Sequence, residues 1–202
     1  NQSTAASQGN KMYAIHAGKA ALNAHYKRLG WNACAQEGAV DGWYQTKFTL
    51  KEEPLVSILI PNKDHTDDLD VCLKSFFERA DYQNYEFIII ENNSVLPETF
   101  AYYEKIEKEH DNVKVVYWEA GFNYSAINNF GFKFAKGDYI MLLNNDVELI
   151  TPDIFQSMLG FCMRPEVGIV GAKLLYSDDT VQHAGVVVGI AGFAGHILTG
   201  YD

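Results

Sequence analysis

Three short polar segments carry the side chains of this sequence that are best suited to chemistry, and each follows a run of apolar residues. They are Pro61-Asn62-Lys63-Asp64-His65, Glu91-Asn92-Asn93-Ser94 and Asn144-Asn145-Asp146. Carboxylate oxygens are the ligands that Mg²⁺ or Mn²⁺ prefers, usually shared with phosphate oxygens of a substrate. Asp146 comes directly after an apolar run, so it is the candidate metal ligand. Its structural alternative is to cap the turn or helix that follows.

Glu91 is the second candidate. An acid at the end of the second strand of a nucleotide-binding sheet can accept hydrogen bonds from a base or a ribose hydroxyl. The alternative is an exposed loop acid without a ligand. No ligand-binding role is needed to explain the acids at 67, 68 and 70, because acids in the first turn of a helix interact favourably with the helix dipole.

Nearly continuous apolar runs precede these segments and predict strands buried on both faces, as in parallel sheets covered by helices. The predicted strands span residues 55–60, 85–90, 113–118, 139–143 and 167–170. Amphipathic segments between them predict helices at 67–80, 97–109, 125–135 and 152–163. This alternation predicts βαβ units, in which the loops after the carboxyl ends of the strands form the ligand crevice.

The segments near the two ends of the sequence predict further short elements. A stripe of Met12, Ile15, Leu22, Tyr26 and Leu29 predicts an amphipathic helix over 11–29 that Gly30 ends. Alternation from residue 44 to 50 predicts a short strand, and we expect residues 1–53 to form an N-terminal extension. Near the other end, residues 178–180 predict a turn between two strands, and residues 186–190 predict another strand.

Charge and cysteine content exclude several classes of protein. Net charge is −10 over 202 residues, and residues 51–202 hold eleven Lys and Arg against twenty-four Asp and Glu. A nucleic-acid-binding face needs clustered cations, so none is expected. Three widely spaced cysteines favour a reducing compartment over a disulfide framework or a zinc site. No apolar run reaches the ~18 residues of a membrane span.

Familiar phosphate-binding and hydrolytic motifs are missing from the sequence. It has no Gly-x-x-x-x-Gly-Lys-Ser/Thr, His-Glu-x-x-His or Gly-x-Ser-x-Gly. Gly189, Gly192 and Gly195 do not match the dinucleotide fingerprint, which argues against a Rossmann oxidoreductase. A nucleotidyltransferase shares the sheet and metal chemistry, but no glycine-rich phosphate loop follows the first strand.

At these residues the chain resembles a family 2 glycosyltransferase with the GT-A fold. Four features carry the resemblance in order: residues 54–64, Glu91-Asn92-Asn93-Ser94, Asn129-Phe130-Gly131 with Gly137-Asp138-Tyr139-Ile140, and Leu143-Asn144-Asn145-Asp146 at the place of the Asp-x-Asp metal motif. Gly137 precedes Asn144 by seven residues, the spacing of the family pattern. Residues 167–176 and 182–186 resemble a rhamnosyltransferase-like, surface-polysaccharide subgroup, and the likeness covers about residues 20–202.

The resemblance implies an α/β fold of three layers, α/β/α, with a mostly parallel sheet after a short helical extension. It implies a bacterial enzyme that moves a hexosyl or deoxyhexosyl group from a UDP-, dTDP- or GDP-linked sugar to a glycan or lipid-linked acceptor, by an inverting in-line displacement. Residues 54–202 would form the nucleotide-sugar-binding domain, truncated before the acceptor part, with a general base beyond Asp202. The expected location is the cytoplasm, including the cytoplasmic face of the membrane.

The site residues that the resemblance implies fall into three sets. Nucleotide-sugar binding is assigned to Pro61, Lys63, Asp64, Glu91, Asn129 and Asn145. Mg²⁺ or Mn²⁺ is assigned to Asp146, and the cleft is expected to include Asn123, Asn144 and His183.

Three departures from the family pattern bear on these assignments. Asn144 replaces the first acid of the metal motif, so a metal would depend mainly on Asp146. Glu91 replaces an Asp, and Asn128 stands where many relatives have Arg. The competing hypothesis is a non-catalytic carbohydrate- or protein-interaction module that retains the fold.

Overall fold

A computed structural model describes residues 12–201, apart from the side chain of Ala191. The described part of the chain divides into two compact units, one of residues 51–155 and the other of residues 12–50 with 156–201. The expected boundary at residue 53 between an extension and a glycosyltransferase domain stays a prediction.

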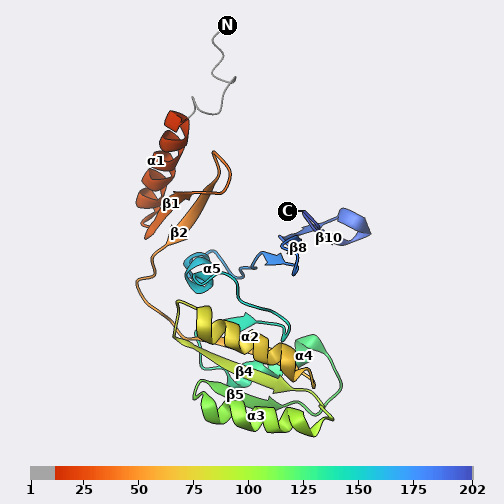
Figure 1. Ribbon diagram of the computed structural model, residues 1–202. Helices are drawn as coiled ribbons and strands as arrows, with labels where there is room; N and C mark the ends of the chain where they lie inside the picture. The colour runs from red at the N-terminus through yellow and green to blue at the C-terminus, as the bar shows by residue number, and fades with distance from the viewer. Residues whose placement is uncertain (1–11, 202) are drawn as a thin grey trace. The chain divides into compact units, whose positions relative to one another are not determined.

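Residues 51–155 contain a parallel four-stranded sheet in the order β5-β4-β3-β6. Its strands are β3 (Val56–Asn62), β4 (Tyr85–Glu91), β5 (Val113–Tyr117) and β6 (Tyr139–Leu142). The helices are α2 (Thr66–Arg79), α3 (Pro97–Glu109) and α4 (Tyr124–Gly131), and they surround the sheet in Figure 1. The predicted three-layer α/β arrangement with a parallel sheet is confirmed.

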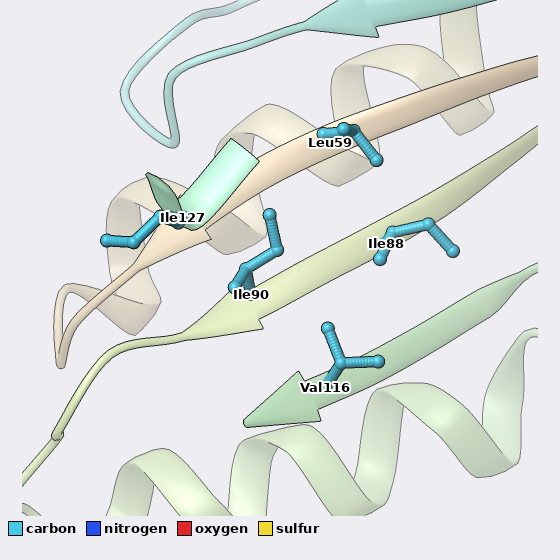
Figure 2. Close-up of a cluster of buried hydrophobic side chains, with 5 residues drawn as sticks. All are labelled: Leu59, Ile88, Ile90, Val116 and Ile127. Carbon is cyan, nitrogen blue, oxygen red and sulfur yellow. The ribbon is translucent and has the colours of Figure 1, made fainter. Parts of the chain in front are cut away.

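The two faces of the sheet are covered by different helices. On one face, Ile127 of α4 packs into a buried cluster with Leu59, Ile88, Ile90 and Val116, shown in Figure 2. Adjacent residues of a strand point to opposite faces. Phe87 therefore lies on the other face, where it meets Phe76 of α2 at a ring distance of 5.7 Å. This burial on both faces explains the continuous apolar runs of the sequence.

The other unit contains short elements. Helix α1 (Met12–Leu29) is followed by the antiparallel hairpin β1 (Ala33–Glu37) and β2 (Tyr44–Phe48). Helix α5 (Ile154–Cys162) starts at the end of the sheet unit and continues into this one. Two small antiparallel pairs follow, β7 (Leu174–Leu175) with β8 (Val181–His183), and β9 (Val186–Val188) with β10 (Ala194–His196).

Several predicted elements need correction. Residues 167–170 form no strand, and Ile169 is 91% exposed, because no neighbouring strand within the described part of the chain supplies a hydrogen-bonding edge there. The helix expected over 125–135 ends at Gly131 and continues as a 3₁₀ turn (Phe132–Phe134). In α1 the predicted stripe is buried only at Ile15 and Tyr26. Strand β1 was not predicted, because Ala33–Glu37 lacks the alternation of a half-buried strand.

Some predictions at the ends of the chain are confirmed. Residues 178–180 do form the turn between β7 and β8, and β9 falls within the strand expected over 186–190. None of the described helices is both long and apolar enough to cross a membrane.

Candidate active site

The three polar segments meet at the carboxyl edge of the parallel sheet. Asn62 and Glu91 end β3 and β4, and they are register partners in that pairing. Strand β6 pairs with β3 on the other side, and the N–H of Leu143 donates to the carbonyl of Leu59 at 3.0 Å. Asn144, Asn145 and Asp146 follow within the next three residues, with Asn145 and Asp146 in a turn. The expected convergence at one sheet edge is therefore present.

A chain of side-chain hydrogen bonds connects these segments. The amide Nδ2 of Asn145 donates to Oδ1 of Asn62 at 2.7 Å, and Nδ2 of Asn62 donates to the hydroxyl of Tyr103 at 2.8 Å. The Tyr103 hydroxyl, on α3, then donates to Oε2 of Glu91 at 2.8 Å. We call these four residues the relay. Asn62, Tyr103 and Glu91 are all buried, so the two links among them are sheltered from water, whereas the link to Asn145 is partly exposed.

Glu91 is held by three donors. Besides Tyr103, the backbone N–H of Ser94 donates to its Oε1 and the Ser94 hydroxyl donates to its Oε2. Only 3% of Glu91 is exposed, so the alternative of an exposed loop acid is wrong. A buried carboxylate that accepts three hydrogen bonds has the partners that a buried charge needs.

Asp64 lies at the start of α3. Its Oδ1 accepts hydrogen bonds from the N–H groups of Val95 and Leu96, at 3.0 and 3.1 Å, and from the hydroxyl of Thr99. Leu96, the N-cap of α3, makes no side-chain hydrogen bond. Asp64, from a distant loop, instead holds the two backbone N–H groups that precede the helix and the Thr99 hydroxyl of its first turn. Its backbone adopts a left-handed conformation with φ of 59°, which Asp tolerates better than most residues.

Two pKa shifts follow from these contacts. Burial acts to raise the pKa of Asp64, but the N–H groups of Leu96 and Val95 and the Thr99 hydroxyl outweigh it, so the pKa is lowered. Burial raises the pKa of Tyr103; the Asn62 hydrogen bond opposes this rise, and Glu91 adds to it. The Tyr103 hydroxyl therefore stays protonated and remains a donor to Glu91.

The donor set around Asp146 fits a divalent cation shared with a substrate. Asp146 and Asn144 are exposed, and no hydrogen bond or ion pair within residues 12–201 uses the Asp146 carboxylate. The described residues contain no cluster of three or more His, Cys, Asp or Glu able to hold a metal alone. Mg²⁺ is commonly bound through one or two carboxylates together with substrate phosphates and water, and one carboxylate beside an amide oxygen suits that mode.

The loop after β5 is joined to the end of β4. The side-chain amides of Asn92 and Asn93 both donate to the carbonyl of Ala120, at 3.1 and 2.9 Å. Asn123 caps α4, because its side chain accepts from the N–H of Ala126 at 3.0 Å. Asn129 is exposed on α4, and its side chain makes no hydrogen bond to the residues from 12 to 201.

The remaining predicted residues are placed as follows. Pro61 is half-buried in β3, and Lys63 is exposed beside Asp64. His183 belongs to the other compact unit. There its Nδ1 lies 2.8 Å from Nδ1 of His196. Both histidines line a cavity of about 420 Å³ that also includes Leu174, Tyr176, Gln182 and Thr199.

Sequence reasoning missed two members of the relay as site residues. Asn62 belongs to one of the three polar segments, but no binding role was assigned to it. Tyr103 was only expected to lie in the helix over 97–109. The available signal was the buried face of α3, on which Thr99, Tyr103 and Ile106 follow at spacings of four and three. A buried hydroxyl needs a partner, and the carboxyl edge of β4 is where α3 could find one.

Comparison with known proteins shows which family contains this sheet and site. The profile of "Glycosyl transferase family 2" matches residues 57–187. The chain therefore belongs to glycosyl transferase family 2.

Two curated relatives are similar over most of this chain. The O-antigen biosynthesis protein RfbC of Myxococcus xanthus is 42% identical over 183 residues, which are 91% of this chain and 14% of that protein. The uncharacterized protein y4gI of Sinorhizobium fredii is 40% identical over 195 residues, which are 96% of this chain and 22% of that protein. The chain thus spans less than a quarter of either relative.

A solved structure supports the fold. The mannosyltransferase PcManGT from Pyrobaculum calidifontis, in complex with GDP-Man and Mn²⁺, superposes with a TM-score of 0.53 at 14% identity. The match covers 77% of this chain and 43% of that one. At this identity the likeness concerns the GT-A arrangement of the sheet and helices.

Proposed function

We propose that this chain forms the nucleotide-sugar-binding part of a glycosyltransferase that acts in cell-surface polysaccharide synthesis. The reaction would move a hexosyl or deoxyhexosyl group from a UDP-, dTDP- or GDP-linked donor to a glycan or lipid-linked acceptor, with inversion. Membership of family 2 and similarity to an O-antigen biosynthesis protein support this proposal. The observation that carries it is the relay that joins three strand ends next to the exposed Asp146 carboxylate, which makes no hydrogen bond or ion pair within residues 12–201.

The residues at the sheet edge have separate roles in this proposal. The β3 segment Pro61, Lys63 and Asp64 would lie along the nucleoside, with Lys63 as the exposed cation near the donor phosphates. Glu91 and its Ser94 neighbour would form the floor of the base-binding side, since the Glu91 carboxylate is already committed to internal donors. Asn129 would contact the donor from α4.

Asp146 would hold Mg²⁺ or Mn²⁺ together with the donor diphosphate, next to Asn144 and Asn145. When bound, the cation would offset the negative charge that develops on the leaving nucleoside diphosphate. The chain contributes an oxygen ligand from a turn four residues after the end of β6, so the sheet places the backbone that carries this ligand before the donor arrives. The surplus of acidic residues is compatible with this role, because the cation brings the positive charge that an anionic donor needs.

Nucleotide-dependent stabilisation tests the proposal. Thermal unfolding is measured with UDP, dTDP and GDP, each with Mn²⁺ and with a chelator. A nucleotide at about 100 times its dissociation constant stabilises the folded state by about 2.7 kcal/mol, which corresponds to a rise in Tm of roughly 5–10 °C. Asp146→Ala is expected to remove the Mn²⁺-dependent part of that rise.

Asp138→Ala is the matched control. Asp138 is also an exposed acid next to β6, but it precedes the strand at the opposite edge of the sheet. Its Mn²⁺ response should equal that of the unsubstituted chain. No shift with any nucleotide would refute the proposal, and a shift with free sugars alone would favour an interaction module that retains the fold.

A further inference from the structure

The central member of the relay is Tyr103, whose hydroxyl is buried far from solvent and yet connects two strand ends. Tyr103 is 1% exposed, and its oxygen accepts from Asn62 while donating to Glu91. Packing against apolar neighbours does not require this hydroxyl. A phenylalanine would fill the same space, so the oxygen needs an explanation other than packing.

The direction of the hydrogen bonds is set at Glu91. The three donors from Tyr103 and Ser94 all use its oxygens as acceptors. Tyr103 has one proton, which it gives to Glu91, and so only its lone pairs face Asn62. Asn62 must then present its NH₂ group to Tyr103 and its carbonyl oxygen Oδ1 to Asn145. The same NH₂ group also donates to the backbone carbonyl of Asp64, at the longer distance of 3.2 Å.

The same constraint passes to Asn145. Because Oδ1 of Asn62 can only accept, Asn145 must present its own NH₂ group inward, at 2.7 Å. Its carbonyl oxygen therefore points away from the relay. Within the described residues, no donor is bonded to that oxygen, which belongs to the residue directly before Asp146.

We propose that Tyr103 is a positioning residue that, through Asn62, fixes the side-chain amide of Asn145 with its oxygen outward, so that the oxygen assists Asp146 in binding a nucleotide-bound divalent cation. This inference rests on the proposed function. It gives the chain a second, neutral oxygen where Asn144 replaces the first acid of the metal motif. Glu91, at the end of β4, is joined to Asn145 by three hydrogen bonds in sequence. Through them it determines which side-chain atom Asn145 presents beside Asp146.

Tyr103→Phe and Tyr102→Phe make a matched pair for the test. Tyr102 precedes Tyr103 on α3, and its hydroxyl meets Oδ1 of Asp70 at 3.3 Å, outside the relay. Dissociation constants of the nucleotide diphosphate that binds best are measured by calorimetry, with Mn²⁺ and with chelator. The quantity compared is the gain in affinity that Mn²⁺ supplies.

Tyr103→Phe is expected to reduce the Mn²⁺ gain about three- to tenfold, the size expected for losing one or two hydrogen bonds. It should leave affinity in chelator within about twofold, and Tyr102→Phe should change neither. Asn145→Ala should reduce the gain to the same extent, and the double variant should be no worse than Asn145→Ala, because both changes interrupt one pathway. Equal losses with and without Mn²⁺, or additive losses in the double variant, would overturn the inference and leave the proposed function intact.

A second measurement needs no ligand. The side-chain NH₂ group of Asn145 gives an NMR signal whose exchange with water is slowed by its bond to Asn62. Tyr103→Phe removes the shorter of the two bonds that hold the Asn62 NH₂ group, which donates to the Tyr103 hydroxyl at 2.8 Å and to the Asp64 carbonyl at 3.2 Å. Exchange at Asn145 should therefore accelerate, whereas Tyr102→Phe should have no effect. Unchanged exchange in Tyr103→Phe contradicts the relay even if the unsubstituted chain binds no nucleotide, an outcome that would refute the proposed function separately.

Discussion

Gly137, two residues before β6, is a position at which a single methyl group should press against the backbone of the sheet. A Cβ built there lies 2.6 Å from the carbonyl oxygen of Leu55, 2.6 Å from the backbone nitrogen of Ser57 and 2.9 Å from the Ser57 hydroxyl. The first two are backbone atoms of β3 and its approach, so no side-chain rotation relieves the contact. The N–H of Gly137 also donates to the Ser57 hydroxyl at 2.8 Å, and Ser57 is fully buried.

The cost of Gly137→Ala can be built from these contacts. Overpacking of this kind costs about 1–3 kcal/mol. Displacing the backbone weakens the bond from Gly137 to Ser57, worth about 0.5–1.5 kcal/mol. The lower entropy of the unfolded alanine chain returns about 0.4–1 kcal/mol. The net expectation is a loss of about 2–3 kcal/mol in the free energy of unfolding, or roughly 4–12 °C in Tm.

Gly121→Ala provides the matched control for this prediction. Gly121 has no atom within 4 Å of its built Cβ and no left-handed backbone, so its replacement should stay within about 0.5 kcal/mol of the unsubstituted chain. Urea unfolding followed by far-ultraviolet circular dichroism measures both variants. If Gly137→Ala unfolds at the same urea midpoint as Gly121→Ala, the reasoning from backbone contact is refuted.

Two further predictions concern ionisable groups. Because the pKa of Asp64 in the folded chain lies below its ordinary value of 3.8, the stability that this carboxylate supplies is present above about pH 4 and is lost as pH falls through the lowered pKa. Acid unfolding should therefore show a smaller loss of Tm between about pH 4 and pH 2 in Asp64→Ala than in the unsubstituted chain, and parallel curves would contradict the capping role. Burial, with a smaller contribution from the charge of Asp146, raises the pKa of Cys72 to about 12, whereas Cys34 is exposed. At about pH 8 a thiol reagent should modify Cys34 in the folded chain and Cys72 only after unfolding, as peptide mass spectrometry would show; similar rates at both would be inconsistent with a buried thiol.

The elements of the sheet were predictable because local sequence determines them. Strands such as Tyr85–Glu91 are apolar on both faces, and helices such as α3 begin with Pro97 and acids. The run at 167–170 misled, because an apolar sequence becomes a strand only when a neighbour offers a free edge. That neighbour is a property of the tertiary structure and leaves no trace in four residues.

The edge of the sheet that carries the site was also predictable, since carboxyl ends of parallel strands converge. The sequence did not reveal which polar side chains are free to bind a ligand and which are hydrogen-bonded within the protein. Asp64 and Glu91 look equally suited to a ligand, yet the structure commits both to internal donors. Tyr103 was missed because its partner Glu91 is twelve residues away and meets it only after α3 packs on the sheet.

The bond pattern of Asp64 has a consequence for the order of folding. The acceptor for the N–H groups before α3 lies 31 and 32 residues earlier in the chain, beyond a whole strand and helix. A peptide of residues 97–109 alone would lack it. The segment that leads into α3 therefore gains its acceptor only once β3 and β4 have paired, so that ordering of this helix start is coupled to closure of the first crossover and not to local propensity alone.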